Sequence, residues 1–186
     1  LNRKSKPGLV VEWNDWLFRI ALAQNDRDDT IKYARWLFID GFRDEREYYT
    51  TLKNYIPAEK WTTYVDELVS DVMAKSRGYT TGRVANIYIL EGWFGRLFEL
   101  VKTSPSLSEL ERYEPYLKKD YASEIALLYS EAIIRYASEN VGRQHYQTIA
   151  RYLRRIKKLG SPEKTGEIIE KLRAEYPQRR ALQEAL

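Results

Sequence analysis

The stretch Gln144–Pro177, QHYQTIARYLRRIKKLGSPEKTGEIIEKLRAEYP, decides the fold of this chain. It predicts two amphipathic helices folded back on each other around a turn at 159–162. Gly160 suits the left-handed position after a helix, Ser161 can cap the next helix, and Pro162 fits its first turn. The turn is short, so we expect the helices to lie antiparallel. Their apolar faces are Tyr146, Ile149, Ala150, Leu153 and Ile156 in the first helix, and Ile168, Ile169, Leu172 and Tyr176 in the second.

A hairpin of this kind exposes an apolar face unless neighbouring helices cover it, so we expect further hairpins before it. The same spacing predicts helices over 9–24, 30–40, 45–56, 58–76, 83–90, 93–102, from 106, and 120–139, with 1–8 as a disordered lead-in and 77–82 as a loop. Glu91-Gly92 is either a true turn or a kink within one helix, and both interpretations stay open. Most hairpins would be roughly 35 residues long, a period typical of tetratricopeptide-like α-solenoids. The sequence therefore predicts an all-α fold of about ten helices that forms one right-handed repeat domain over residues 9–186.

Several local patterns predict where helices begin or end and which faces they bury. Asp28 or Asp29 can cap the second helix, and Ser106 with Glu109 matches a capping box. Pro115 is expected to interrupt the helix that starts at 106. Segment 120–139 is apolar over so wide an arc that we expect helices on both its sides. The face of the first helix that we expect to be buried consists of Trp13, Trp16, Leu17, Ile20 and Ala21.

Composition narrows the class of protein. The 186 residues are 44% hydrophobic and 31% charged, which is typical of a globular domain. The chain contains no cysteine, so disulfides and thiolate metal sites cannot form, and a reducing compartment such as the cytoplasm is allowed. No apolar run approaches the roughly 20 residues that span a bilayer. Because the chain begins with Leu1, we expect a piece of a longer protein.

Charge is distributed unevenly. The net charge of the chain is +4, but segment 106–140 is acidic and segment 142–186 carries eleven basic against five acidic residues. In the latter, basic residues fall on one side of the helix, opposite its apolar face: Arg143, Arg151, Arg154, Arg155 and Lys158. Such a stripe can follow the phosphates of a nucleic acid, with Tyr152 near its margin. It is equally typical of a solvated helix face, and both interpretations stay open.

Candidates for catalysis have simpler interpretations. His145 is the only histidine and has no motif partner, so we expect a surface or half-buried ring at a helix start. Glu109, Glu111 and Glu114 cluster in sequence, but acidic residues near a helix start interact well with its dipole and stay solvated there. We therefore expect no catalytic residue, no cofactor and no metal site.

Aromatic residues suggest a binding surface instead. The chain has fifteen Tyr and five Trp, and Tyr33, Trp36 and Tyr79 do not fit the inward faces. Surplus rings on a helical stack often line a groove for a peptide or a partner helix. Misplaced helix faces would explain them equally well.

The C-terminal residues carry a resemblance to a known family. Tyr152-Leu153, Lys157-Lys158-Leu159-Gly160 and the closing run 176–186, YPQRRALQEAL, resemble the tail of bacterial SWIM zinc-finger proteins. Upstream segments such as Glu47-Tyr48-Tyr49 and Ile87-Tyr88-Ile89 are similar to the helical region before that tail. Gln178 and Arg180 depart from the family pattern, and the Cys and His ligands of the zinc finger are absent from this chain. The resemblance implies a non-catalytic helical region attached to a module that contacts DNA or proteins.

These observations favour a protein-interaction scaffold whose partner is another protein or another domain of the same parent. A nucleic-acid-binding accessory domain that uses the basic face of helix 143–159 is the alternative. No membrane partner is expected, and the oligomeric state stays open.

Overall fold

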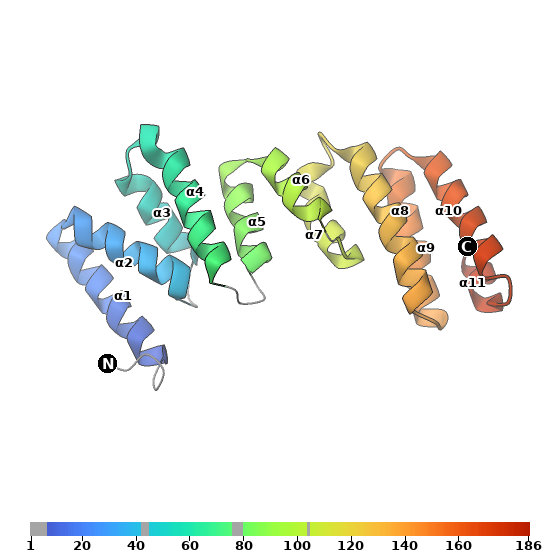
Figure 1. The fold of residues 1–186 in the computed structure, drawn as a ribbon, viewed down its shortest axis with the longest axis horizontal. Helices are drawn as coiled ribbons and strands as arrows, with labels where there is room; N and C mark the ends of the chain where they lie inside the picture. The colour runs from blue at the N-terminus through green and yellow to red at the C-terminus, as the bar shows by residue number, and fades with distance from the viewer. Residues whose placement is uncertain (1–6, 42–44, 76–79, 104) are drawn as a thin grey trace. The chain divides into compact units, whose positions relative to one another are not determined.

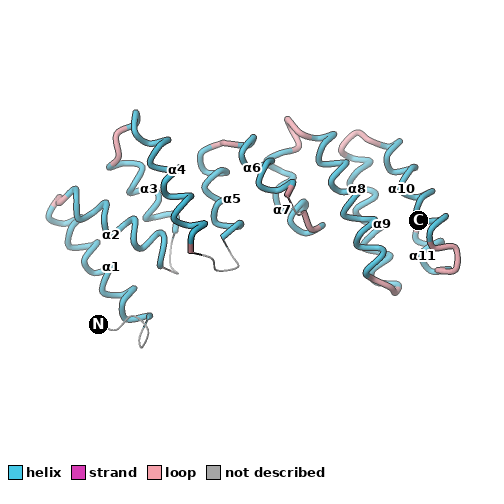
Figure 2. Tube along the Cα trace, in the orientation of Figure 1, coloured by secondary structure: helices cyan, strands magenta, loops and turns pink. Residues whose placement is uncertain are grey.

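The computed structural model describes residues 7–41, 45–75, 80–103 and 105–186. Every regular element in these ranges is an α-helix, so the predicted all-α fold is confirmed (Figures 1 and 2). In the described residues no helix is long and apolar enough to cross a membrane. The helices are α1 (Pro7–Gln24), α2 (Arg27–Asp40), α3 (Glu45–Tyr55), α4 (Ala58–Ala74), α5 (Thr80–Glu91), α6 (Phe94–Lys102), α7 (Leu107–Leu117), α8 (Ala122–Glu139), α9 (Arg143–Lys158), α10 (Pro162–Glu175) and α11 (Arg180–Ala185).

The chain divides into two compact units, Leu1–Val84 and Ala85–Leu186. In the first unit α2 packs against α1, α3 and α4. Phe18, Leu37 and Leu52 are fully buried there. The ring of Phe18 meets that of Tyr48 edge-on with centroids 5.3 Å apart, an arrangement that aromatic pairs prefer. One continuous repeat domain over 9–186 stays a prediction.

The second unit is built around α8 and α9. Helix α8 contacts α7, α9 and α10, as its wide apolar arc predicted. Its Tyr129 and Ile133 are fully buried, together with Ile149 and Ile156 of α9. Helix α11, which the sequence did not predict, packs on α9 and contributes the buried Leu182. The core of this unit extends from α5 to α11, because Ala85 of α5 and Leu97 and Val101 of α6 belong to the same buried cluster.

The turn between α9 and α10 follows the predicted design in most respects. Gly160 has φ +86° and Pro162 opens α10. The predicted apolar faces of both helices are buried or half-buried. Ser161 occupies the N-cap position, but its side chain makes no capping hydrogen bond, so that part of the prediction is wrong.

Several helix ends differ from the prediction. Residues 1–6 of the expected lead-in lie outside the described residues, but Pro7 and Gly8 belong to α1, since proline is favoured in a first turn. Asp26 caps α2 by accepting from the Asp29 amide at 3.0 Å, so α2 starts three residues early. Helix α5 begins at Thr80, within the expected loop.

The turn at 91–93 and helix α7 were also predicted in part. Segment 91–93 is a true turn, because Gly92 has φ +68°. The predicted capping box is present: the Ser106 side chain accepts from the Glu109 amide while the Glu109 carboxylate accepts from the Ser106 amide. Helix α7 runs through Pro115 and ends two residues later. The expected interruption is therefore wrong: the Pro115 ring removes one backbone hydrogen bond of α7 but does not break the helix at that position.

Candidate functional site

An exposed apolar stripe on α1 is the most distinctive surface in the described residues. Trp13 is 53% exposed, Trp16 67%, Leu17 38% and Ile20 48%. The prediction that these residues form the buried face is wrong. The predicted burial of Ala21 is confirmed, and the side chains buried with it are Val11 and Phe18, on the other apolar side of α1. We call Trp13, Trp16, Leu17 and Ile20, with the half-buried Leu9, the outer stripe.

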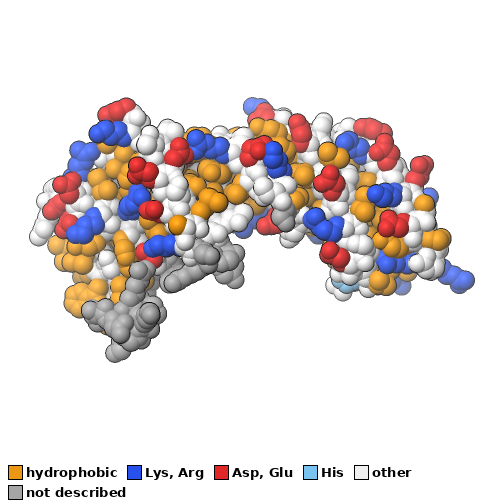
Figure 3. All heavy atoms as spheres, viewed as in Figure 1, with side chains coloured by type: hydrophobic (Ala, Val, Ile, Leu, Met, Phe, Trp, Pro, Cys, Tyr) orange, Lys and Arg blue, Asp and Glu red, His pale blue; other side chains and the backbone are white. Residues whose placement is uncertain are grey.

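Exposed large hydrophobic side chains are concentrated in the outer stripe and occur singly elsewhere. Nine large hydrophobic side chains are exposed among the described residues, and four of them lie on α1 at the spacing of one helical face. The other five are single residues on separate elements, an ordinary condition for a protein surface. Figure 3 shows hydrophobic side chains gathered over α1 on the face that it displays. A contiguous apolar patch of this kind marks a contact surface more often than chance exposure.

A groove runs along the N-terminal half of the outer stripe. The described residues that line it are Leu9, Glu12, Trp13 and Trp16, and its volume is about 370 Å³. Its walls are one turn of α1 apart, so it can receive a bulky side chain from a partner. Leu9, Trp13 and Trp16 supply its apolar lining, and Glu12 supplies a charge.

Polar contacts on the flank of α1 fix its orientation. Arg19 donates from Nη2 to Glu47 Oε2 at 2.8 Å and also pairs Nη1 with Oε1 of the same carboxylate. The Tyr48 hydroxyl donates to Asp15 Oδ1 at 2.9 Å. Burial and this hydrogen bond raise the pKa of Tyr48 to about 12. These bonds join α1 to α3 and hold the outer stripe on the side away from the buried face.

The predicted basic stripe on α9 is partly neutralised. Arg155 donates from Nε to Glu114 at 2.5 Å and from Nη1 to Glu111 at 2.7 Å. Arg151 lies 3.4 Å from the Glu111 carboxylate. Two of the five predicted cations therefore face carboxylates of α7. The remaining three are exposed: Arg143, Arg154 and Lys158.

Two tyrosines complete this contact between α7, α8 and α9. Tyr152 donates to Glu111 at 2.8 Å, and Tyr129 donates to Glu114 at 3.0 Å. Burial and the Glu111 carboxylate raise the pKa of Tyr152 to about 12, and burial beside Glu114 raises that of Tyr129 further. The Tyr152 hydrogen bond lowers the pKa of Glu111 despite its partial burial.

The cluster of three glutamates has a different role from the one predicted. Glu109 does serve the start of α7 through the capping box. Glu111 and Glu114, expected to be solvated, accept hydrogen bonds from other helices instead, and the Glu114 side chain is only 12% exposed. Sequence reasoning missed this network because the partners of Glu111 and Glu114 belong to other helices and lie 15 to 44 residues away in the chain. The opposite charges of segments 106–140 and 142–186 were the available signal.

The histidine and the surplus aromatic residues singled out in the sequence do not form an exposed cluster among the described residues. His145 is half-buried at the start of α9, as predicted, and its Nδ1 lies 2.7 Å from the Tyr136 hydroxyl. Tyr33 and Trp36 are half-buried on α2, with the Lys32 ammonium 4.5 Å from the Tyr33 ring centroid. Tyr79 lies outside the described residues. Both exposed tryptophans of the described chain thus lie on α1, where the prediction had placed a core, and the other exposed aromatic residue is Tyr116 of α7.

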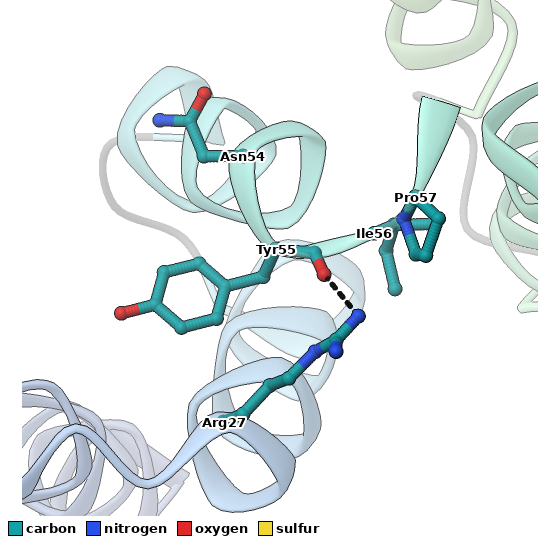
Figure 4. A pocket seen from close by; sticks show the side chains of 5 residues that line it. All are labelled: Arg27, Asn54, Tyr55, Ile56 and Pro57. Atoms are coloured by element: carbon teal, nitrogen blue, oxygen red, sulfur yellow. Dashed lines mark hydrogen bonds between the residues drawn. The ribbon is translucent and has the colours of Figure 1, made fainter. Parts of the chain in front are cut away.

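A second pocket lies at the C-terminal end of α3. Arg27, Asn54, Tyr55, Ile56 and Pro57 line it, and its volume is about 410 Å³ (Figure 4). Arg27 donates to the Tyr55 carbonyl at 2.8 Å, a contact that satisfies a free carbonyl of the last turn. The arginine in this pocket is therefore engaged in capping the helix.

Comparisons with other proteins add no assignment. Searches of family models, curated proteins and solved structures found no match to this chain. Within the described ranges no three His, Asp or Glu side chains come together as metal ligands. The resemblance to SWIM zinc-finger proteins therefore stays a prediction.

Proposed function

We propose that this chain is a non-catalytic helical scaffold for protein–protein interaction and that the outer stripe of α1 is its contact surface. The observation that carries the proposal is the exposure of Trp13, Trp16, Leu17 and Ile20 on one helical face. With fully exposed areas of roughly 200 Å² per side chain, these four present roughly 400 Å² of apolar surface. Tryptophan is also the residue most enriched among those that dominate binding energy.

The chemistry of the stripe favours an amphipathic helix as partner. Its exposed residues recur at three and four positions, the spacing with which one helix packs into the grooves of another. The groove beside Trp13 and Trp16 suits a branched aliphatic side chain. Each indole N–H needs an acceptor once covered, and polar side chains at the margin of a partner helix can supply one.

Binding is favoured over catalysis because the clustered charged side chains already join or cap helices. Glu111 and Glu114 join α7 to α8 and α9, and Arg155 is bound to both carboxylates. Glu109 caps α7, and Arg27 caps α3. These titratable groups support helix packing, whereas Trp13, Trp16, Leu17 and Ile20 of the outer stripe are exposed.

Nucleic-acid binding through α9 is the alternative, supported by the exposure of Arg143, Arg154 and Lys158 on that helix. Titration with duplex and single-stranded DNA at two salt concentrations tests it. Affinity that falls steeply with salt, and that Arg143→Ala with Arg154→Ala removes, would favour this alternative. Weak binding that is insensitive to salt would eliminate it.

We also propose that the chain is part of a larger protein located in the cytoplasm. The quoted C-terminal residues support a place in the C-terminal part of a larger SWIM zinc-finger-like protein. The absence of cysteine from the chain is compatible with the cytoplasm.

Site-specific photocrosslinking in the source cells tests the proposed surface. A photoreactive phenylalanine analogue replaces Trp16, and the matched control carries it at the exposed Tyr116 of α7. We expect a discrete adduct from position 16 that Ile20→Ser removes, and none from position 116. Absence of any adduct at position 16 would contradict the proposal.

A further inference from the structure

We propose that the helix docked on the outer stripe is α1 of a second copy of this chain, lying antiparallel to the first. This inference rests on the proposed function, since it names the partner of the same surface. It comes from the order of apolar and charged residues along α1, which is self-complementary in one orientation and not in the other.

The outer stripe has the period of a two-stranded coiled coil. Its central residues alternate by four and three, which assigns Trp13 and Ile20 to heptad a positions and Leu9 and Trp16 to d positions. Leu17 then falls on one flank, at an e position. These positions lie opposite the side of α1 that is buried by its own unit. A second helix can therefore approach without disturbing the existing core.

The charges on the other flank select the antiparallel orientation. Glu12 and Arg19 occupy successive g positions, one heptad apart. In an antiparallel pair, g positions face g positions, so Glu12 of each copy meets Arg19 of the other. In a parallel pair, g positions face e positions, and Glu12 would meet Leu17. Only the antiparallel arrangement joins opposite charges, and it does so twice.

Arg19 can donate hydrogen bonds to Glu47 of its own chain and to Glu12 of the second copy at the same time. A guanidinium has five N–H donors, and the bonds to Glu47 use one on each terminal nitrogen. The Arg19 side chain is 47% exposed, so it is accessible from outside the unit. The Glu47 contact would hold the guanidinium in place for Glu12 of the second copy.

The apolar residues also match in this orientation. Layers of the antiparallel pair join a to d positions, which brings Trp13 against Trp16 and Leu9 against Ile20. Ile20 of one copy thus enters the groove lined by Leu9, Trp13 and Trp16 of the other. On the e flank the half-buried Val10 faces Leu17, so that side is apolar in both copies.

A membrane surface fits this helix less well. Amphipathic helices that lie in a membrane interface carry a cationic polar face. Among the described residues, the charged flank of the outer stripe instead holds one acid and one base, Glu12 and Arg19. The roughly 800 Å² buried by two stripes lies at the low end for protein interfaces, so we expect a weak, reversible dimer.

Analytical ultracentrifugation of the whole chain from roughly 5 to 500 µM tests the inference. We expect reversible dimerisation that Ile20→Ser abolishes and that Leu127→Ser, at an exposed site on α8, leaves unchanged. Glu12→Arg and Arg19→Glu each place like charges at both contacts and should weaken self-association about tenfold. Mixed together, these two variants restore opposite charges at both contacts and should form heterodimers at near wild-type affinity. Circular dichroism of each variant verifies its fold.

Three results would overturn the inference: a wild-type chain that stays monomeric throughout, charge variants that do not recover on mixing, or a monomer that binds anionic lipid vesicles through Trp16. The photocrosslinking experiment separates this failure from that of the proposed function. An adduct with a different protein at position 16 would leave the contact surface intact and refute only the second copy. No adduct and no dimer would refute both.

Discussion

Replacing Arg155 by methionine should destabilise the second unit by about 2 kcal/mol. Arg155 donates to both Glu114 and Glu111, and its own side chain is 29% exposed. Removing one member of a fully buried ion pair costs about 3–5 kcal/mol. Solvent can rehydrate Glu111, but Glu114 is nearly buried, so we reduce the expected loss to about 2 kcal/mol. Methionine keeps most of the aliphatic length and limits the loss of packing.

Arg154→Met is the matched control for this prediction. Arg154 is the adjacent residue of α9, it is exposed, and its Nε donates only to the Ala150 carbonyl of its own helix at 3.1 Å. The same substitution there should change the free energy of unfolding by less than about 0.5 kcal/mol. The pair of variants thus separates the contact between α7 and α9 from the general effect of losing a positive charge.

Hydrogen exchange measured by mass spectrometry on peptides from 144–159 is the appropriate assay. It reports the free energy of opening α9 itself, without interference from the other unit. We expect faster exchange in the Arg155→Met chain by roughly thirtyfold, the equivalent of 2 kcal/mol. Equal exchange in the two variants would refute the reasoning, because it would mean that Glu111 and Glu114 do not depend on Arg155.

Further predictions concern packing, backbone and pH. Ile149→Ala should cost about 3 kcal/mol because the side chain is fully buried, whereas Leu127→Ala, at an exposed site, should cost less than about 0.5 kcal/mol; urea denaturation followed by circular dichroism measures both. Gly92→Ala should lower stability by about 1 kcal/mol in the same assay, because φ is +68°, and an unchanged midpoint would contradict this. The pKa of Tyr152 is about 12 in the folded chain, against 10.0 ordinarily, so the unfolded chain ionises first and stability should fall as pH rises from 10 to 12. Tyr152→Phe should make that fall shallower, and a slope identical to wild type would show that the group is not protected.

Much of the fold follows from local sequence signals. The hairpin at 159–162 depends on Gly160, whose positive φ was expected from its place after an apolar period. The capping box at Ser106 depends on two residues three apart. Such signals act within one helical turn, so they can be recognised in the sequence without knowledge of the tertiary structure. The helix that ends the chain was missed because α11 has six residues and is held by packing of Leu182 on α9.

The candidate site was harder to predict because it depends on which helix face finds a neighbour. Helix α1 is apolar on two sides, and periodicity alone favoured Trp13 and Trp16 over Phe18. Larger aromatic rings are ordinarily the better candidates for burial, and here they are exposed. The ion pairs of Arg155 were missed for a related reason, since the acidic partners belong to α7, 41 and 44 residues earlier in the chain.

Cysteine trapping on α1 tests the proposed pairing most directly. The chain has no cysteine of its own, so Leu9→Cys and Ile20→Cys variants each carry a single thiol. In the antiparallel pair Leu9 of one copy lies against Ile20 of the other. Oxidation of an equimolar mixture should therefore give a disulfide-linked dimer, and neither variant alone should do so. A dimer formed by Ile20→Cys alone would show parallel helices, and no linked dimer in the mixture would contradict docking of a second copy on the outer stripe.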